Sequence, residues 1–384
     1  MSILPALLSL QARGSSEPAR TRSVSRRVRF CLVTNDFPPA VGGIQTYFRS
    51  LLEALPADRV CVVAPARPGS EHVDSRFRFP IVRVASFRGQ LLPGRRTLRR
   101  LVHAVRDLEP SVIGFGSSMP LGFLAPELSR RLDIPFVMWH HGAELSIAAR
   151  IPGLGKVLAS RLSHASLHFV VSDWTRRLVE STLGKDAPVE VMRYGVDTER
   201  FAPSAEGPLP SSHARALSVG RLVRRKGNDA AILALAALHR KGVSITLDIA
   251  GGGPDRKRLE SLARDVGVAD RVRFVGVVGD EELPSLYRSH DFFVAPIRSR
   301  LFGLESEGLG ITLLEAQASG LPVIAGDSGG TREALVDGET GFMVDGRNET
   351  EVARAMGREF VRQHYSREAM VAAFEAGLKR VQAS

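Results

Sequence analysis

The chain has 384 residues, of which 44% are hydrophobic and 24% are charged. That length suits about two domains with cores of their own, and the composition excludes disordered, collagen-like and disulfide-stapled chains. The formal net charge is +11, but residues 1–100 hold 17 basic and 6 acidic side chains, whereas residues 101–384 hold 35 of each. The basic excess therefore belongs to the first quarter of the chain, and no apolar run approaches the ~20 residues of a membrane-spanning helix.

The first residues and the cysteines indicate the cellular compartment. Residues 1–27 form a basic leader rich in Ser and Arg, whose composition predicts disorder. Cys31 and Cys61 both lie in apolar, strand-like runs, which predicts two buried, reduced thiols. We therefore expect a cytoplasmic protein that is at most peripheral on the inner face of the membrane.

From residue 28 onward, short β-branched runs alternate with longer amphipathic segments, which is typical of βαβ units around a parallel sheet. Strands are predicted at 28–34, 60–64, 81–85, 111–115, 135–139, 167–171 and 189–192. Helices are predicted between them at 43–55, 97–107, 120–132, 151–164 and 173–182. These elements form one doubly wound, Rossmann-like domain over 28–203.

A Pro-, Ser- and Gly-rich stretch at 203–212 predicts a linker, after which the alternation resumes. Strands are predicted at 215–219, 244–250, 271–275, 292–295, 321–325 and 341–344, with helices at 227–240, 254–267, 280–289, 308–319 and 348–363. The fold class is α/β, with a second Rossmann-like domain over 213–365. Two such domains predict a cleft at the carboxyl ends of both sheets, where open α/β sheets bind ligands.

Two turns of the first domain follow strands and could face that cleft. Gly42 and Gly43 open a helix, where backbone N–H groups attract phosphate, although a tight turn without a ligand explains them equally well. His140 and His141 end a buried strand and are a poor metal pair, because neighbouring side chains diverge. One of the two is expected to bind substrate by a hydrogen bond, and the alternative is a histidine satisfied within the core.

The first turn of the second domain carries four cations, Arg221, Arg224, Arg225 and Lys226. Their place at a strand end suits a diphosphate, since Arg offers a bidentate fork and Lys a point charge. The Gly251–Gly253 run lacks the dinucleotide-binding spacing, and close packing of helix on strand explains it.

The most specific motif is a pair of carboxylates, Glu307 and Glu315, separated by seven residues. Gly308–Ile311 are expected to open the helix between them, so that their N–H groups meet phosphate. Glu307 would then accept hydrogen bonds from sugar hydroxyls, and Glu315 from a ribose diol.

These pieces, in this order, resemble the retaining glycosyltransferases of family 4, which have the GT-B fold. The E-x7-E pair, the Arg221-x4-Lys226 pair, the Gly42-Gly43-Ile44 turn and the Tyr194-Gly-Val-Asp197 segment carry the likeness over residues 28 to about 381. Phe37–Gln45 and Arg298–Ile311 are similar to the GDP-mannose-dependent phosphatidyl-myo-inositol mannosyltransferases. The resemblance also implies that the terminal helix, 366–384, packs back on the first domain.

Roles for individual residues follow from this resemblance. His141, Glu307, Arg221 and Lys226 would be catalytic. The donor would be bound by a larger set, namely Gly42, Gly43, Arg221, Lys226, Glu307, Gly308, Leu309, Gly310, Ile311 and Glu315. Gln45 and Tyr47 would lie on the acceptor side. The partners implied are a nucleotide-sugar donor and a lipid-linked or glycan acceptor.

The expected reaction is front-face transfer with retention, in which the acceptor proton passes to a leaving-group oxygen. No carboxylate nucleophile is evident, in contrast to retaining hydrolases. No D-x-D motif is present, so the cations and helix dipoles would stabilise the diphosphate, and no cofactor or metal is expected.

Three alternatives differ in donor or in class. The first is a family 4 enzyme that uses a UDP-sugar on a polysaccharide or glycolipid precursor. The second is a sugar-nucleotide 2-epimerase of the same fold, whose catalytic carboxylates are not matched. The third is a basic nucleic-acid-binding protein, which is disfavoured because the cations are not interleaved with aromatic residues; nucleic acid is therefore not an expected partner.

One segment predicts contact with an anionic membrane surface. Arg95, Arg96, Arg99 and Arg100 alternate there with leucines, the pattern of an interfacial helix. The alternative is a solvated basic face above ordinary core leucines.

Overall fold

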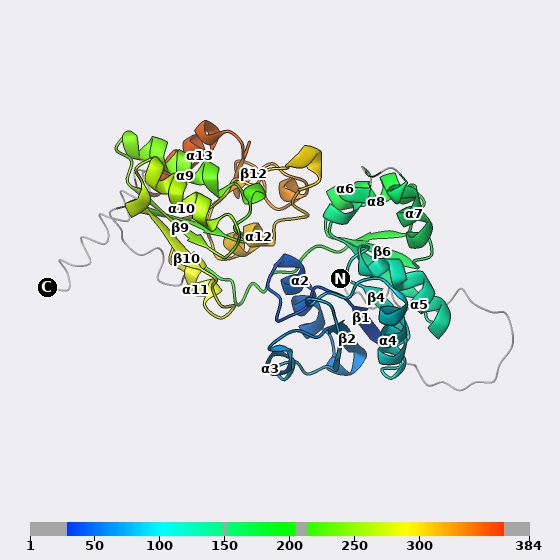
Figure 1. Ribbon diagram of the computed structural model, residues 1–384. Helices are drawn as coiled ribbons and strands as arrows, with labels where there is room; N and C mark the ends of the chain where they lie inside the picture. Colours follow the sequence, from blue (N-terminus) through cyan, green and yellow to red (C-terminus); the bar gives the residue numbers. More distant parts are fainter. Residues whose placement is uncertain (1–28, 149–150, 152, 205–212, 365–384) are drawn as a thin grey trace. The chain divides into compact units, whose positions relative to one another are not determined.

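The computed structural model describes residues 29–148, 151, 153–204 and 213–364, which Figure 1 draws in colour. The chain divides into two compact units, Met1–Gly195 (unit 1) and Val196–Ser384 (unit 2). The predicted leader and the predicted terminal helix, 366–384, lie outside the described residues, and so does most of the predicted linker, 205–212.

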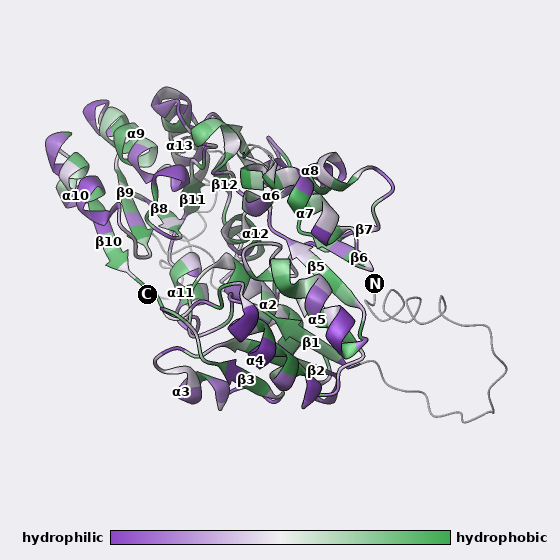
Figure 2. Cartoon of the chain, turned by 45° about the vertical axis from the view of Figure 1, so that its right-hand side comes forward, coloured by the Kyte–Doolittle hydropathy of each residue, from purple (hydrophilic) through white to green (hydrophobic). Residues whose placement is uncertain are grey.

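Unit 1 is built on a seven-stranded parallel sheet in the order β3-β2-β1-β4-β5-β6-β7. The strands are β1 (Phe30–Val33), β2 (Val60–Pro65), β3 (Ile81–Val84), β4 (Val112–Phe115), β5 (Phe136–His140), β6 (Leu167–Val170) and β7 (Val189–Val191). The inner strands are buried along their whole length because helices cover both faces of a parallel sheet. Figure 2 shows the hydrophobic character of β1, β2 and β5.

The helices of unit 1 are α2 (Gly43–Glu53), α3 (Ser70–Asp74), α4 (Arg95–Arg106), α5 (Ala125–Leu132), α6 (Ala143–Ala148), α7 (Leu154–Leu162) and α8 (Asp173–Leu183). Apolar residues of α4 to α8 pack in one cluster with those of the sheet. Short 3₁₀ turns occur at Ala57–Arg59 and Leu121–Leu124. Cys31 pairs with Cys61 across β1 and β2, and both are buried free thiols, which confirms that prediction.

Unit 2 has a six-stranded parallel sheet in the order β10-β9-β8-β11-β12-β13. The strands are β8 (Ala214–Val219), β9 (Ile245–Ala250), β10 (Val272–Gly276), β11 (Phe292–Ala295), β12 (Val323–Gly326) and β13 (Gly341–Val344). The helices are α9 (Asn228–Arg240), α10 (Arg256–Asp265), α11 (Leu283–Arg288), α12 (Ile311–Ala318) and α13 (Glu349–His364). The 3₁₀ turns are Arg224–Lys226, Ala269–Arg271, Leu301–Gly303 and Thr331–Glu333.

The two faces of the unit 2 sheet have separate cores. One face packs against α9, α10 and α13, and the other against α11 and α12. Every predicted strand lies within about two residues of its expected bounds, a normal uncertainty for element ends. Two short helices were not predicted, α3 and α6, and α6 begins directly after the His140–Gly142 turn.

Candidate active site

The loop after β8 holds its cations close to the loop after β11. Gly227 has φ of +74°, and a Cβ atom there would lie 1.8 Å from the Pro296 carbonyl oxygen, so only glycine fits. The Arg298 N–H donates to the Arg225 carbonyl at 2.9 Å, which ties the two loops together. This packing fixes the position of Lys226, the residue before Gly227.

Lys226 and Arg225 converge on one carboxylate of unit 2. Lys226 Nζ donates to Glu307 Oε2 at 2.8 Å, and the Arg225 guanidinium donates to the same oxygen. The three side chains are only 14–21% exposed. We call them the cation–carboxylate cluster.

The charges and the burial of this cluster shift the pKa values of Glu307 and Lys226. Burial alone would raise the pKa of Glu307, but the charges and hydrogen bonds of Lys226 and Arg225 outweigh burial and lower the pKa to about 2. Burial lowers the pKa of Lys226, and Glu307 opposes that shift. Glu307 is therefore a permanent anion, whereas the charge of Lys226 is sensitive to alkaline pH.

The backbone of Glu307 is held by the turn after β12. Its N–H donates to Ser328 Oγ at 3.3 Å, and its carbonyl accepts from Gly330 N–H at 2.9 Å. Gly329 has φ of +63°, and a Cβ there would lie 2.2 Å from the Glu307 carbonyl oxygen. The loops after β8, β11 and β12 thus meet at the carboxyl edge of the sheet.

The second carboxylate lies deeper. Glu315, on α12, is 3% exposed, and its Oε2 accepts from the Tyr287 hydroxyl at 3.0 Å. The helix begins at Ile311 after a left-handed Gly310, so Gly308 and Leu309 precede it and do not open it as predicted. Leu309 is buried.

An excess of positive charge remains around Glu307. Arg221 is exposed and lies close enough to Lys226 for its charge to lower the pKa of that amine. Three cations beside one carboxylate favour a ligand with more than one negative charge, such as a diphosphate. Arg225 is one of the four cations expected to suit a diphosphate, but no individual role was predicted for it, because only folding brings it to Glu307.

In unit 1, the structure separates the two histidines of the β5 turn. His140 is buried in the core, where its Nε2 lies 3.0 Å from His168 Nδ1. His141 is partly exposed and its Nε2 lies 2.9 Å from the Gly116 carbonyl. A carbonyl only accepts, so His141 Nε2 carries the proton and Nδ1 the lone pair of the neutral ring.

Neighbouring groups hold His141 in place. Its ring meets the rings of Tyr47 and Phe48 edge-on, with centroids 6.0 and 5.7 Å away. Its backbone N–H donates to Glu144 Oε1 at 2.8 Å. Burial lowers its pKa, although the Gly116 hydrogen bond and Asp36 act in the opposite sense. His141 is therefore a fixed, neutral hydrogen-bonding group.

The Gly42–Gly43 turn begins α2 beside this histidine. Gly43, the first residue of α2, is exposed, and the first N–H groups of an α-helix have no partner within the helix. Gln45 Nε2 donates to Asp36 Oδ1 at 2.8 Å. Tyr47 is 4% exposed and its hydroxyl donates to the Met192 carbonyl at 3.0 Å. Tyr47 is thus a core residue that supports His141, which differs from its predicted place on the acceptor side.

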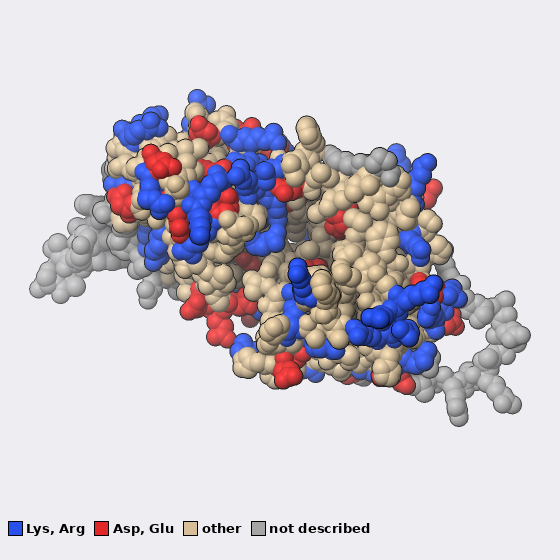
Figure 3. Space-filling view, in the orientation of Figure 1, with Lys and Arg blue, Asp and Glu red and all other residues tan. Residues whose placement is uncertain are grey.

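The four arginines predicted to meet a membrane, Arg95, Arg96, Arg99 and Arg100, lie on α4 and are all exposed. Figure 3 shows basic side chains gathered over α4 and α5. A pocket of about 550 Å³ lies there, lined by Arg95, Leu98, Arg99 and Arg131. Leu98 and Leu101 on the same helix are buried in the core. Within the described residues, no helix combines the length and the apolar character needed to cross a bilayer.

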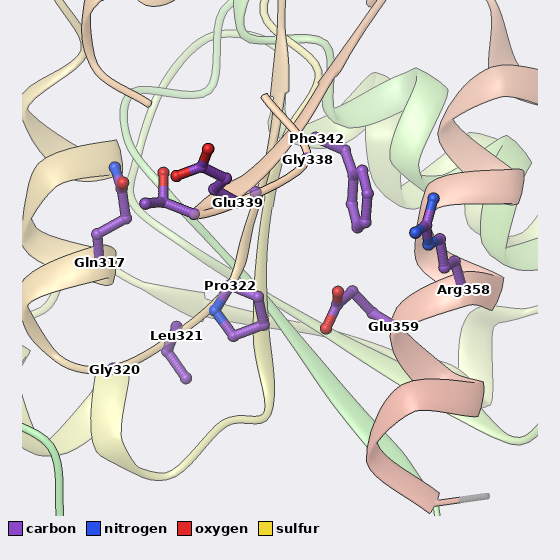
Figure 4. Close-up of a pocket in the computed structure, with 11 residues that line it drawn as sticks. Gln317, Gly320, Leu321, Pro322, Gly338, Glu339, Phe342, Arg358 and Glu359 are labelled. Atoms are coloured by element: carbon purple, nitrogen blue, oxygen red, sulfur yellow. The ribbon is translucent and has the colours of Figure 1, made fainter. Parts of the chain in front are cut away.

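A second pocket, of about 390 Å³, lies at the amino ends of β12 and β13 (Figure 4). Leu321 and Pro322 line it just before β12, and Thr340 just before β13. The Arg358 guanidinium lies 4.9 Å from the centroid of the Phe342 ring at its rim. This pocket is therefore separate from the cation–carboxylate cluster. Among the described residues, no group of three or more His, Cys, Asp or Glu side chains could hold a metal ion.

Solved structures share this architecture. Sucrose-phosphate synthase of Thermosynechococcus elongatus has a TM-score of 0.73 at 22% identity, covering 93% of this chain and 100% of that one. HepE of Anabaena, solved with UDP and glucose, has a TM-score of 0.72 at 19% identity, covering 86% and 89%. Two parallel Rossmann-like sheets with these likenesses define the GT-B fold, as predicted.

Sequence relatives identify the family. The description Glycosyltransferase Family 4 matches residues 41–200, and Glycosyl transferases group 1 matches residues 202–373. A GDP-mannose-dependent alpha-(1-6)-phosphatidylinositol monomannoside mannosyltransferase of Mycobacterium tuberculosis is 36% identical, covering 85% of this chain and 88% of the relative. Its counterpart in Mycolicibacterium smegmatis is also 36% identical, covering 85% and 87%. The chain belongs to glycosyltransferase family 4 and is an enzyme of the hexosyltransferase type.

Proposed function

We propose that this enzyme transfers α-mannose from GDP-mannose to a hydroxyl of a mannosylated phosphatidylinositol lipid, with retention of configuration. The observation that carries the proposal is the cation–carboxylate cluster, in which Glu307 accepts from Lys226 at 2.8 Å and from Arg225. The printed names of the relatives at 36% identity supply the donor and the acceptor class.

The donor diphosphate would bind the cations of unit 2. Arg221, Arg225 and Lys226 would take its charge, helped by N–H groups of Gly308–Ile311 near the start of α12. Glu307 would accept hydrogen bonds from the mannose hydroxyls through the lone pairs that its cations leave open. Glu315 would take the ribose diol, with Tyr287 fixing the orientation of its carboxylate.

Unit 1 would serve the acceptor and the transferred sugar. His141 would contact the sugar at the reaction centre, since its tautomer and ring plane are fixed by Gly116, Tyr47 and Phe48. Gly42 and Gly43 would let the chain approach the phosphates closely, and Gln45 would lie on the acceptor side. Tyr47 would act only by supporting His141.

The chemical step would occur on one face of the sugar. The bond between the anomeric carbon and the diphosphate oxygen breaks, and the acceptor oxygen bonds to the same carbon from the same side. The acceptor proton passes to the departing diphosphate oxygen. Arg221, Arg225 and Lys226 would stabilise the charge that develops on this leaving group, the largest single contribution in many enzymes.

The basic face of α4 would bring the enzyme to its lipid. Arg95, Arg96, Arg99 and Arg100 project from a helix whose leucines are buried, so their charges are displayed without exposing the core. Anionic headgroups attract such clusters by about 1 kcal/mol per cation near the surface. The enzyme would thus work as a peripheral protein on an anionic membrane.

A transfer assay tests the proposal. The purified protein is incubated with radiolabelled GDP-mannose or UDP-glucose and with vesicles that contain phosphatidylinositol monomannoside. We expect labelled lipid to form from GDP-mannose and not from UDP-glucose. The rate should be the same with and without EDTA, because the cations take the place of a metal at the diphosphate. Transfer only from UDP-glucose, or activity that EDTA abolishes and Mg²⁺ restores, would contradict the proposed donor or the proposed chemistry.

A further inference from the structure

A projecting apolar turn, Leu301–Gly303, lies in the loop between β11 and Glu307. Phe302 is 96% exposed and Leu301 is 54% exposed. Both have backbones in the left-handed region, with φ of 56° and 49°, which is unfavourable for residues with bulky side chains. Figure 1 shows the segment around residue 302, in gold, at the margin of unit 2. Such strain persists only where the surrounding structure imposes it.

Hydrogen bonds brace the turn at its base. Arg300 and Glu305 form an antiparallel bridge, with N–H to carbonyl distances of 2.9 and 3.2 Å, and their side chains pair at 2.9 Å. Below them, Ser299 Oγ lies 2.9 Å from Ser306 Oγ. The exposure of Phe302 is therefore built into the turn, because the bonded base holds the apex outward.

The turn is joined to the donor carboxylate. Ser328 Oγ lies 3.0 Å from Ser299 Oγ at the base of the turn, and it accepts from the N–H of Glu307 at 3.3 Å. Five positions of chain separate Phe302 from Glu307. A ligand bound at the apex would thus lie on the same hydrogen-bonded loop as Glu307, the residue proposed to bind the donor sugar.

The charge around the turn indicates what it would contact. The exposed Arg347 donates to the Ser299 carbonyl at 2.5 Å, a neutral acceptor that leaves the positive charge uncompensated in that bond. An apolar apex above a cation matches an anionic lipid, which offers acyl chains beside a phosphate. A water-soluble glycan offers only the small C–H faces of its sugar rings, whereas an acyl chain offers a continuous apolar surface to both Leu301 and Phe302.

We propose that the Leu301–Phe302 apex contacts the acyl portion of the lipid acceptor and thereby selects lipid over water-soluble acceptors. This inference rests on the proposed function, because it requires a lipid acceptor. The apex is a specificity element, and it takes no part in bond making. We therefore expect the apex to affect kcat/KM for the lipid acceptor and to leave the KM for GDP-mannose unchanged.

The test compares Phe302→Asn with matched variants. Asn tolerates the left-handed backbone, so the turn keeps its shape while the ring is lost. Phe302→Leu restores an apolar side chain, and Val336→Asn removes another exposed apolar residue, 53% exposed, from the same unit. For each protein, kcat/KM is measured with phosphatidylinositol monomannoside in vesicles and with its deacylated headgroup, and KM is measured for GDP-mannose.

We expect Phe302→Asn to lower the ratio of the two acceptor efficiencies by about tenfold, with the donor KM unchanged and with Phe302→Leu close to wild type. Val336→Asn should leave the ratio unchanged. If the ratio is unaltered in Phe302→Asn, including the case of equal losses on both acceptors, the role proposed for the apex is overturned and the proposed function stands. Wild-type protein that mannosylates neither acceptor overturns the proposed function and this inference with it.

Discussion

At the scale of single residues, the candidate site depends on one carboxylate shared by two cations. An isolated buried carboxylate would be costly, but Lys226 and Arg225 compensate the charge of Glu307 and hold its Oε2. The same bonds fix the direction of the other lone pairs before any ligand arrives. The site is preorganised, which is how fixed polar groups contribute most to catalysis.

Removing the charge of Glu307 should affect the rate of mannose transfer and the affinity for GDP differently. We expect Glu307→Gln to lower kcat for mannose transfer by about 100-fold or more, because the amide holds the sugar hydroxyls and the two cations less firmly. Affinity for GDP should be kept or improved, since a negative charge beside the phosphates is lost. The measurements are initial rates and calorimetric titration with GDP.

Glu339→Gln is the matched control, because Glu339 is exposed and lies at the amino end of β13 in the same sheet. It should leave both kcat and GDP affinity unchanged. Full activity in Glu307→Gln would contradict the role proposed for the cation–carboxylate cluster.

The lowered pKa of Lys226 predicts a weaker grip on the diphosphate at alkaline pH. Lysine is charged below its pKa, and burial brings that pKa below the usual 10.5, so GDP affinity should fall as pH rises through the lowered value. Arginine stays charged throughout this range. In Lys226→Arg the alkaline loss of affinity should therefore disappear, as titrations with GDP between about pH 7 and 10 would show. Identical pH profiles for the two proteins would exclude Lys226 as the titrating group.

At the scale of elements, α4 shows how one helix serves two purposes. Leu98, Leu101 and Val105 fill the core of unit 1, while the arginines of the same helix face outward. This division follows from the 3.6-residue period, which puts positions three and four apart on one face. Arg131 of α5 adds its charge to the same pocket.

Three substitutions on this surface should release the protein from anionic vesicles. We expect Arg95→Ala, Arg99→Ala and Arg131→Ala together to weaken binding by about 100-fold at low salt, from about 1 kcal/mol per cation. Cosedimentation with vesicles that contain phosphatidylinositol measures the effect. The control replaces Lys241, Lys257 and Arg264, three exposed cations of unit 2, by Ala. Equal losses in both triple variants would mean that net charge, and not α4, governs binding.

The strands β5 and β6 carry a buried pair of histidines whose ionisation affects stability. Burial lowers the pKa of His168 from 6.5 to about 4, and burial with the nearby charges of His168 and His141 lowers that of His140 as well. Between about pH 6.5 and 4 the unfolded chain therefore binds more protons than the folded one. The stability of unit 1 should decrease as pH falls through this window, by on the order of 3 kcal/mol from His168.

Urea unfolding at several pH values tests this prediction. The two tryptophans of the chain, Trp139 and Trp174, both belong to unit 1, so their fluorescence reports that unit. His168→Gln should show a smaller loss of stability between pH 6.5 and 4, whereas His103→Gln, on the exposed face of α4, should behave as wild type. An undiminished loss in His168→Gln would show that other groups cause the acid sensitivity.

At the scale of the whole molecule, the net positive charge is concentrated in the first quarter of the chain. The excess lies in residues 1–100, of which α4 supplies four exposed arginines, whereas residues 101–384 are balanced. In unit 2, acidic side chains balance part of the positive charge directly, as with Arg298 and Asp229 or Arg215 and Asp291. Nonspecific attraction to anionic surfaces should therefore come mainly from unit 1.

The sequence by itself determined the succession of strands and helices along the chain, the two Rossmann-like sheets and the motifs that identify family 4. Strand runs rich in Val, Ile and Phe and the turns between them are local signals, so β1 to β13 could be located from composition and periodicity alone. Lys226 and Glu307 could be predicted as site residues because each belongs to a short local motif, Arg221-x4-Lys226 and Glu307-x7-Glu315. The short helices α3 and α6 were missed because five or six residues carry too little periodicity.

Only the tertiary structure decided which side chains meet. Arg225 joins Lys226 at Glu307 although 82 positions separate it from that carboxylate, and nothing local in the basic turn distinguishes it from Arg224. Likewise, His140 and His141 are neighbours in the chain, yet strand alternation buries one beside His168 and leaves the other beside Gly116. Tyr47 is in the core for the same reason: contacts between distant segments depend on how sheets and helices pack, which sequence spacing does not specify.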